Sequence, residues 1–219
     1  MYTIKDIFDL NHTIAGDYLL SFVYPWEALD GIEALILSLG PSLGEDYKEV
    51  MKGVWVHRSA VIAPSASISG PCIIGEGTEV RHCAFIRGSV LAGKNCVIGN
   101  STEVKNSILF DRVEIPHFNY VGDSILGYCS HMGAGAITSN IRSDRKNIVI
   151  HDGGKDYETL RLKVGAMLGD HVEVGCSAVL NPGTIIGRNS RVYPLTLVRG
   201  VVPGNFILRN DGELRDILY

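Results

Sequence analysis

The chain has 219 residues, with 20 Lys plus Arg against 24 Asp plus Glu, and a formal net charge of −4. This balance lacks the basic excess that a nucleic-acid backbone requires, so nucleic acid is not an expected partner. No run of about 18 apolar residues and no signal-peptide pattern occurs, which predicts a soluble, cytoplasmic protein with no membrane partner. The five cysteines form no C-x-x-C pair, so we expect neither a disulfide framework nor a metal site.

The N-terminal residues 1–53 carry helical signals. The segment Ala28–Leu39 has apolar residues at helical spacing, and it lies between Tyr24-Pro25-Trp26-Glu27 and the helix-stopping pair Gly40-Pro41. No glycine-rich phosphate loop occurs here. We therefore predict an N-terminal helical cap or packing arm rather than a separate catalytic domain.

Residues 54–203 follow a six-residue period. An aliphatic residue recurs every six positions from Val56 to Val104, and the register resumes after two five-residue steps and again from Leu168 to Val198. The fourth residue after each anchor is usually small or β-branched, and glycine often follows the anchor. These features predict a mainly β protein, a parallel β-helix whose coils have three six-residue sides and tight-turn glycines. Cys72 and Cys96 then occupy small interior positions without a reactive role.

Two segments interrupt or end this pattern. The period stops between Thr138 and Val164, in a loop at 139–163 that carries six Lys and Arg residues. Loops this long inside a compact repeat are usually functional, so we predict a flexible cationic arm that reaches over a neighbouring chain or an anionic ligand. The alternative is a solvated excursion without a task. The tail 204–219, with apolar residues such as Phe206, Leu214 and Leu218, is expected to form a C-terminal cap.

Two cations occupy equivalent positions on successive coils. Arg87 follows the anchor Ile86, and Lys105 follows Val104 one coil later. Like charges one strand apart repel each other, so a shared anion would explain them, unless Glu103 and other acids neutralise the pair.

The next coil adds His117 and Tyr120, which we expect on the approach to the face that holds the two cations. Imidazole titrates near neutrality and can accept a proton from an incoming amine or hydroxyl group. His117 is therefore a candidate general base for acyl transfer from a thioester.

Three motifs in this region occur in a fixed order: GNSTEVKNS, PHFNYVGDS and GAGAITSN. With residues 60–203 as a whole, they resemble the acetyltransferase half of the bifunctional N-acetylglucosamine-1-phosphate uridyltransferase/glucosamine-1-phosphate N-acetyltransferase, a hexapeptide-repeat acyltransferase. The resemblance implies a left-handed parallel β-helix, acetyl-CoA as co-substrate, and a homotrimer with each site between subunits.

The resemblance also implies roles for individual residues. His117 matches the family's general base, and Ala134 matches a residue that contacts acetyl-CoA. The chain departs from the family at His131, which replaces Asn beside the sugar and acetyl groups, and at three positions of the coenzyme cleft: Ile141 replaces Tyr, Cys176 replaces Ser and Pro194 replaces Ala. The residues that match groups binding the sugar phosphate or the substrate are Arg87, Lys105, Tyr120, Asn140 and Lys146.

Together these features favour a CoA-dependent N-acetyltransferase that acts on an amino-sugar phosphate such as glucosamine-1-phosphate, in the pathway to UDP-N-acetylglucosamine. No stretch resembles the uridyltransferase half, so we expect a free-standing, pyrophosphorylase-related form. One alternative is a non-catalytic sugar-nucleotide sensor or scaffold. Another is a γ-type carbonic anhydrase-like metalloprotein, but its histidines would lie five apart, and the seven histidines include no such pair.

Overall fold

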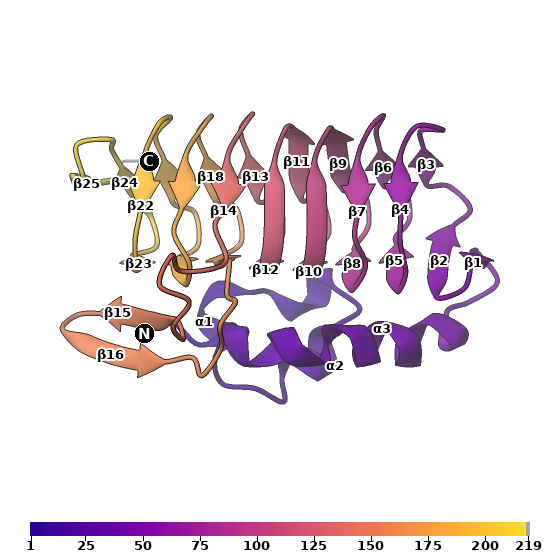
Figure 1. Cartoon of the computed structure of the whole chain (residues 1–219), viewed down its shortest axis with the longest axis horizontal. Helices are drawn as coiled ribbons and strands as arrows, with labels where there is room; N and C mark the ends of the chain where they lie inside the picture. The colour runs from indigo at the N-terminus through magenta and orange to yellow at the C-terminus, as the bar shows by residue number, and fades with distance from the viewer. Residues whose placement is uncertain (218–219) are drawn as a thin grey trace.

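The computed structural model describes residues 1–217, which form a left-handed parallel β-helix with a helical segment along one side (Figure 1). This confirms the predicted fold class. The helical segment consists of α1 (Ile4–Ile7), η1 (Leu10–His12), α2 (Gly16–Leu19), η2 (Pro25–Gly31), α3 (Ile32–Leu39) and η3 (Gly40–Ser42), where η marks a 3-10 helix.

Each coil of the β-helix has three sides, which we call face 1, face 2 and face 3. Face 1 contains β4 (Ser67–Ile68), β7 (Phe85–Ile86), the first halves of β10 (Glu103–Leu109) and β12 (Tyr120–Leu126), β14 (Ile137–Thr138), β19 (Val179–Leu180) and β22 (Leu197–Val198). Face 2 contains β2 (Val54–His57), β5 (Cys72–Ile74), β8 (Val90–Ala92), the second halves of β10 and β12, β17 (Ala166–Leu168), β20 (Thr184–Ile186) and β23 (Val201–Val202). Face 3 contains β3 (Val61–Ile62), β6 (Glu79–Val80), β9 (Val97–Asn100), β11 (Glu114–His117), β13 (His131–Met132), β18 (Glu173–Val174), β21 (Arg191–Val192) and β24 (Phe206–Leu208).

The strand register follows the six-residue period. Val80 pairs with Ile98, eighteen residues later, and Ile98 pairs with Ile115, seventeen residues later. The shorter second interval is the five-residue step seen in the sequence. The anchors therefore stack directly above one another inside the coil, as predicted.

The glycines after the anchors have a different purpose from the one expected. The corners of the coils do use left-handed backbone, but mostly at non-glycine residues such as Arg112, Phe118 and Asp123. Gly75 and Gly133, by contrast, are not left-handed. A Cβ atom on Gly75 would lie 2.2 Å from the carbonyl oxygen of Gly93 on the next coil, and one on Gly133 would lie 2.7 Å from the backbone nitrogen of Cys176. These glycines are required by the close approach of adjacent coils.

The interior positions of the coil hold mostly apolar residues, with some buried Thr and Ser among them. Cys72 and Cys96 are fully buried, and burial raises the pKa of each thiol to about 12, so both remain protonated and unreactive at neutral pH. This confirms their interior role.

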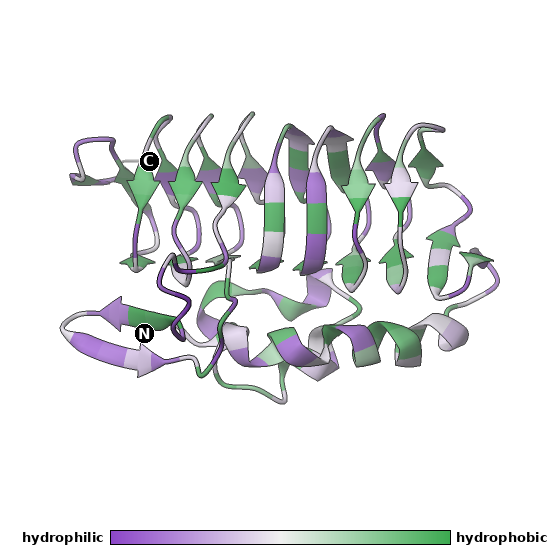
Figure 2. Ribbon diagram, viewed as in Figure 1, coloured by the Kyte–Doolittle hydropathy of each residue, from purple (hydrophilic) through white to green (hydrophobic). Residues whose placement is uncertain are grey.

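Face 2 is covered by the N-terminal segment. Its outward side chains are apolar and fully buried, so its strands are hydrophobic on both sides (Figure 2). The helix α3 packs on β8 and β10, and η2 packs on β12. Residues 4–42 thus lie along the side of the coil as a packing arm, and the α-helix begins at Ile32 because the predicted segment from Ala28 starts in the 3-10 helix η2. The buried outward residues are Ile73, Leu91, Ile108, Ile125, Met167 and Ile185.

The interrupting segment forms an antiparallel hairpin of β15 (Val149–Asp152) and β16 (Lys155–Glu158). The Arg161 guanidinium donates hydrogen bonds to the Asp30 carboxylate at 2.8 Å and to the Glu27 carbonyl at 3.0 Å. These contacts hold the hairpin against the chain's own N-terminal segment (Figure 1), so the segment is docked in this structure. Its reach over a neighbouring chain or an anionic ligand stays a prediction.

The ends of the β-helix carry two further antiparallel strands. β1 (Tyr47–Met51) pairs with β2 at the first coil, and β25 (Leu214–Asp216) pairs with β24 at the last. Part of the expected C-terminal cap, including Leu218, lies outside the described residues. None of the helices within residues 1–217 is long and apolar enough to cross a membrane.

The packing of face 2 predicts that shortening a buried leucine between β8 and α3 lowers stability more than shortening an exposed leucine on α3. Replacing Leu91 with Ala should lower the free energy of unfolding by about 2–5 kcal/mol, because a side chain between β8 and α3 is lost. Leu37→Ala is the matched control, since Leu37 is 48% exposed on α3, and its cost should stay within about 1 kcal/mol. Urea unfolding measures both, and equal losses would contradict the packing arrangement.

Candidate functional site

Face 1 presents a column of outward residues, each placed directly after an inward anchor. We call this set the polar column. The strand pairs Ile86 with Val104, Val104 with Val121, and Leu180 with Val198 fix its register. Its members are Arg87, Lys105, Gly122, Ser139, Asn181 and Arg199.

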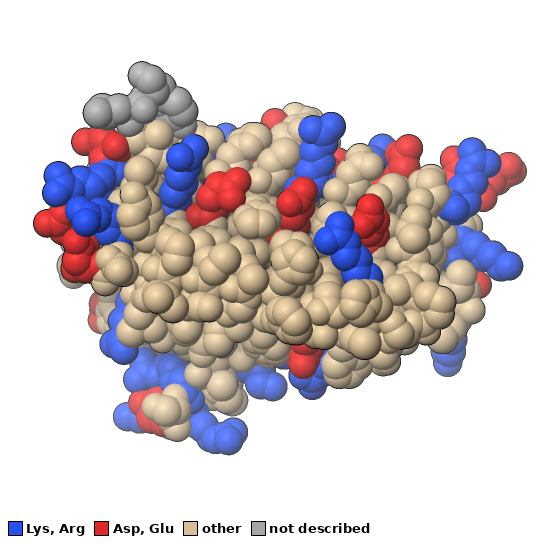
Figure 3. All heavy atoms as spheres, turned by 90° about the horizontal axis from the view of Figure 1, so that it is seen from above, with Lys and Arg blue, Asp and Glu red and all other residues tan. Residues whose placement is uncertain are grey.

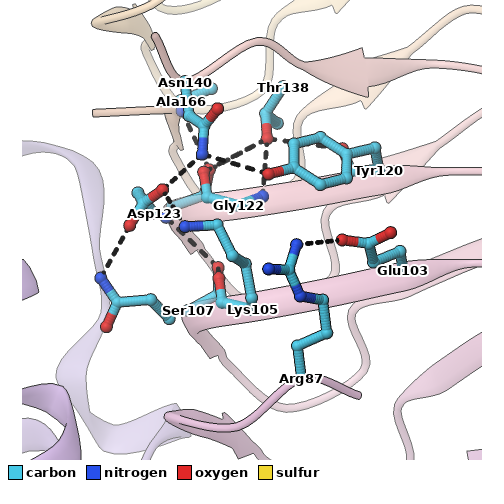
Figure 4. Close-up of polar contacts among 12 residues, drawn as sticks. Arg87, Glu103, Lys105, Ser107, Tyr120, Gly122, Asp123, Thr138, Asn140 and Ala166 are labelled. Carbon is cyan, nitrogen blue, oxygen red and sulfur yellow. Dashed lines mark hydrogen bonds and ion pairs between the residues drawn. The ribbon is translucent and has the colours of Figure 1, made fainter. Parts of the chain in front are cut away.

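The two cations at the start of the polar column each have a carboxylate partner (Figure 4). Arg87 donates from Nη1 to Glu103 at 2.7 Å, and Lys105 donates from Nζ to Asp123 at 2.7 Å. Acids therefore neutralise both cations, as the alternative interpretation of the sequence held, and the shared anion stays a prediction. Each cation still keeps donors that these pairs do not use, namely Nε and Nη2 of Arg87 and two N–H bonds of Lys105.

Asp123 is the centre of a hydrogen-bonded group on face 1, although the sequence analysis did not select it. We call this group the polar cluster, and its members are Arg87, Glu103, Lys105, Asn106, Tyr120, Asp123 and Asn140. The Asp123 side chain is 6% exposed, and it accepts hydrogen bonds from Lys105, from Asn106 Nδ2 at 2.9 Å and from Asn140 Nδ2. It lies at the corner between faces 1 and 2, where its φ is +50°. The carboxylate therefore fixes Lys105 and Asn106 from the preceding coil and Asn140 from the following one, and Figure 4 shows Lys105 and Asn140 on either side of it.

Tyr120 and Asn140 belong to the same cluster. The Asn140 amide donates to the Tyr120 hydroxyl at 3.1 Å. Partial burial of Tyr120, followed by the charges of Asp123 and Glu103, raises the pKa of its phenol above the usual value. The phenol therefore stays protonated at neutral pH. Because its oxygen accepts from Asn140, its own hydrogen can be donated to a ligand on face 1.

A second set of predicted residues stacks at the corner between faces 3 and 1. We call His117, Ala134, Cys176 and Pro194 the corner column. The backbone links these positions through three hydrogen bonds: Gly135 N–H to the His117 carbonyl at 3.0 Å, Ser177 N–H to the Ala134 carbonyl at 2.8 Å, and Leu195 N–H to the Cys176 carbonyl at 2.9 Å. The four residues therefore lie on four successive coils, about 4.8 Å apart.

Asn119 holds this corner in place. It is buried, and its Oδ1 accepts the His117 backbone N–H at 3.0 Å while its Nδ2 donates to the carbonyls of Gly133 at 2.8 Å and Ala136 at 3.0 Å. The His117 side chain itself is exposed and has no hydrogen-bond partner among the described residues. The Ala134 N–H likewise has no acceptor within residues 1–217. A free imidazole and a free amide N–H thus lie on adjacent coils.

The corner column and the polar cluster lie on either side of one corner. His117 ends β11 on face 3, and Tyr120 begins β12 on face 1, where it pairs with Glu103. These two strands are connected by Phe118, whose backbone is left-handed, and by the buried Asn119. The structure therefore brings His117 to the edge of the face that holds Arg87 and Lys105.

Three predicted site residues lie outside both clusters. His131 is on face 3, where its Nδ1 lies 3.1 Å from the Glu173 carboxylate and its backbone pairs with Glu114. Lys146 is exposed on the loop before β15, and its ammonium has no hydrogen bond or ion pair with any residue from 1 to 217. Ile141 forms an isolated bridge with Lys163 at the base of the hairpin. No group of three or more His, Cys, Asp or Glu side chains in the described chain could hold a metal ion.

Comparison with known families assigns the chain to one of them. The sequence profile of the GMPPB C-terminal domain matches residues 68–202, which are most of the β-helix. The chain belongs to this family.

Curated proteins that are similar to this chain include longer, bifunctional proteins. A bifunctional sugar-1-phosphate nucleotidylyltransferase/acetyltransferase from Sulfurisphaera tokodaii is 32% identical over 194 residues, which are 86% of this chain and 48% of that protein. The bifunctional protein GlmU of Methanococcus maripaludis is 34% identical over 193 residues, with 86% and 46% covered. The chain thus spans about half the length of these curated relatives. These matches confirm the resemblance to the bifunctional enzymes.

A solved structure with a similar fold is the acetyltransferase domain of PglB from Neisseria gonorrhoeae in complex with acetyl coenzyme A. Its TM-score is 0.39 at 16% identity, and the match covers 75% of this chain and 57% of that one.

The buried position of Asp123 predicts a stability effect that the exposed pair does not share. Asp123→Asn removes the charge partner of Lys105 and presents an N–H to existing donors, so it should cost about 2–4 kcal/mol of unfolding free energy. Glu103→Gln, at the more exposed pair with Arg87, should cost no more than about 1 kcal/mol. Asn tolerates the left-handed backbone, so the difference reports the contacts. Denaturant titration that ranks the two variants equally would contradict the role of Asp123.

Proposed function

We propose that the chain is a CoA-dependent N-acetyltransferase that acetylates the amino group of a phosphorylated amino sugar such as glucosamine-1-phosphate. The observation that carries this proposal is the pair of clusters on either side of one corner: an exposed imidazole with a free amide N–H, and a face with hydrogen-bond donors for an anion. The acetyltransferase named in the Sulfurisphaera relative supports the reaction class.

His117 is the proposed general base. Its imidazole accepts a proton from the substrate amine as the nitrogen bonds to the acetyl carbonyl carbon and the carbon–sulfur bond breaks. The proton then passes to the departing thiolate, which balances the step. The free N–H of Ala134 on the next coil can donate to the carbonyl oxygen as negative charge develops there.

The substrate phosphate and sugar are assigned to face 1. Arg87 and Lys105 retain unused N–H donors one coil apart, and charge-assisted hydrogen bonds to a phosphate are stronger than those between neutral groups. The protonated Tyr120 supplies a further donor. Asp123 and Asn140 hold these groups in position, and the neutralised cations favour a bound anion less strongly than free ones would. His131 and Lys146 remain proposed substrate contacts.

The corner column fits the thin arm of acetyl-CoA, which supplies the activated acetyl group when it is bound. Ala134, Cys176 and Pro194 have short or compact side chains, and Cys176 and Pro194 are exposed. The three residues span about 10 Å along the coil axis, a length suited to part of an extended chain. Cys176 and Pro194 thus replace Ser and Ala of the related enzymes without blocking the column.

We also propose that the chain forms a homotrimer in which a partner surface completes the site. The corner beside His117 carries exposed apolar side chains: Phe118 is 62% exposed, Leu195 76% and Leu197 58%. Figure 3, which views the molecule from the side of this corner, shows a long band with few Lys, Arg, Asp or Glu side chains. Exposed apolar side chains on a surface with few charges are typical of an interface.

The general-base role predicts a specific loss of turnover. His117→Ala should lower kcat about 10²–10⁴-fold in an acetyl-CoA and glucosamine-1-phosphate assay, while the unfolding free energy stays nearly unchanged because the imidazole is exposed. Arg87→Ala should instead raise KM for the sugar phosphate about tenfold or more.

His82→Ala is the matched control for the turnover assay. His82 is an exposed histidine at the same corner two coils earlier, and its removal should leave kcat unchanged. Wild-type rates in both the His117 and Arg87 variants would refute the assignment of the site.

The interface proposal predicts a mass near three times 23.8 kDa by light scattering at micromolar concentration. Leu195→Ser should shift this mass toward that of the monomer, because it removes apolar surface from the proposed contact. Val61→Ser, on a residue 64% exposed on face 3, should not. A monomer mass for the wild-type protein would contradict the proposed trimer.

A further inference from the structure

A cleft lies between the hairpin and the later coils, apart from the polar cluster and the corner column. Its volume is about 540 Å³. The coil side presents Ser139, Asn181 and Arg199, which are the continuation of the polar column, and the hairpin side presents Arg142 and His151. Its apolar wall is formed by Ile141, Ile148, Ile150 and Pro182.

The walls of this cleft are fixed by the fold. Gly183 and Gly200, at the corner between faces 1 and 2, have φ values of +79° and +69°. A Cβ on Gly183 would lie 2.8 Å from Ile148 Cγ2, and one on Gly200 would lie 2.9 Å from the His151 carbonyl oxygen. The hairpin therefore rests directly on these two glycines, with Ile148 and Ile150 buried beneath it. The cleft keeps its shape because both of its sides are packed.

The charges around the cleft favour an anion. Arg199 has no hydrogen bond or ion pair with any residue in the described chain. Arg142 donates from Nε and Nη2 to the two oxygens of Asp144, at 2.9 and 2.8 Å, which leaves Nη1 available. This contact lowers the pKa of Asp144, so that carboxylate stays ionised at neutral pH. His151 faces Asp156 on the same hairpin. Two guanidinium groups thus stand against one carboxylate inside the cleft.

The ligand is defined by this geometry. Guanidinium groups pair with phosphate oxygens through parallel N–H donors, and the hydroxyl groups of Ser139 and Ser143 add neutral donors. The volume falls in the range of small-molecule sites, about 300–1,000 Å³, and exceeds what a single phosphate fills. We propose that the cleft binds the diphosphate group of a small-molecule ligand, with Arg199 as its main contact.

That diphosphate has two possible sources, a nucleoside-diphosphate sugar or coenzyme A. Assigning either one as a reactant rests on the proposed function, whereas the anion site rests on the cleft alone. Binding is therefore measured without turnover, by calorimetric titration of the full chain with pyrophosphate, UDP, GDP and coenzyme A.

We expect the wild-type protein to bind at least one of these probes, and Arg199→Gln to weaken that binding about 10- to 100-fold. Arg191→Gln is the matched control, because Arg191 is also exposed and lies on face 3. It removes the same charge and should change affinity less than twofold. Arg199-dependent binding of UDP or GDP assigns the cleft to the acceptor, and such binding of coenzyme A alone assigns it to the acetyl donor.

The proposal is overturned if none of the four probes binds at about 1 mM, or if the Arg199 and Arg191 variants weaken binding equally. Circular dichroism confirms that both variants fold. A protein that binds a diphosphate through Arg199 but transfers no acetyl group would retain the anion site and refute the proposed activity, so the two failures are distinguishable.

Discussion

The hydrogen-bonded spacing between coils is the constraint on which both sites depend. Parallel strands lie about 4.7–4.9 Å apart, so a repeat of seventeen or eighteen residues places equivalent positions directly above one another. Any side chain that recurs at one position becomes part of a column. The coil cannot widen this spacing at Gly75 or Gly133, where the adjacent backbone leaves no room for a Cβ atom. The columns are therefore rigid scaffolds for a ligand that spans several coils.

A second consequence of the same geometry is that each face must be solvated or covered. Face 2 carries an apolar outward row, and its strands contain consecutive buried residues, as in Val90–Ala92. Such rows are unstable in water, and the N-terminal helices bury them. This covering leaves the corner between faces 3 and 1, with His117, free of helices. The N-terminal segment thus stabilises the coil without obstructing the proposed site.

The features that follow from the six-residue period could be predicted from the sequence. The anchors, the interior cysteines and the adjacency of Arg87 and Lys105 follow from counting residues along the coil. The uninterrupted apolar runs of face 2 were also a visible signal that both of its sides are buried, although only the inward residues were predicted.

Contacts between residues far apart in the chain were beyond such counting. Asp123 and Asn119 act through partners on neighbouring coils, and a buried Asp or Asn in a repeat shows no periodic signal of its own. The docking of the hairpin depends on Arg161 and Asp30, which are 131 positions apart. A cationic loop with no detectable period therefore looked like a free arm, when its position is set by an ion pair and by buried isoleucines.

The distribution of charge along the polar column connects these observations. At its start, Arg87 and Lys105 each face an acid supplied by the fold, and the cost of bringing two cations within one strand spacing is offset before any ligand arrives. At its other end Arg199 has no hydrogen bond or ion pair among the described residues, and it lies four coils from Lys105, the nearest cation of the column. Because it has no like charge beside it on the coil, it needs no internal acid for stability. A cation that the fold neither neutralises nor crowds retains its full attraction for an anion, and the hairpin places a second guanidinium across the cleft from it. The two ends of the polar column therefore attract phosphate with different strength. The cause is the presence or absence of a neighbouring carboxylate, and not the position on the repeat.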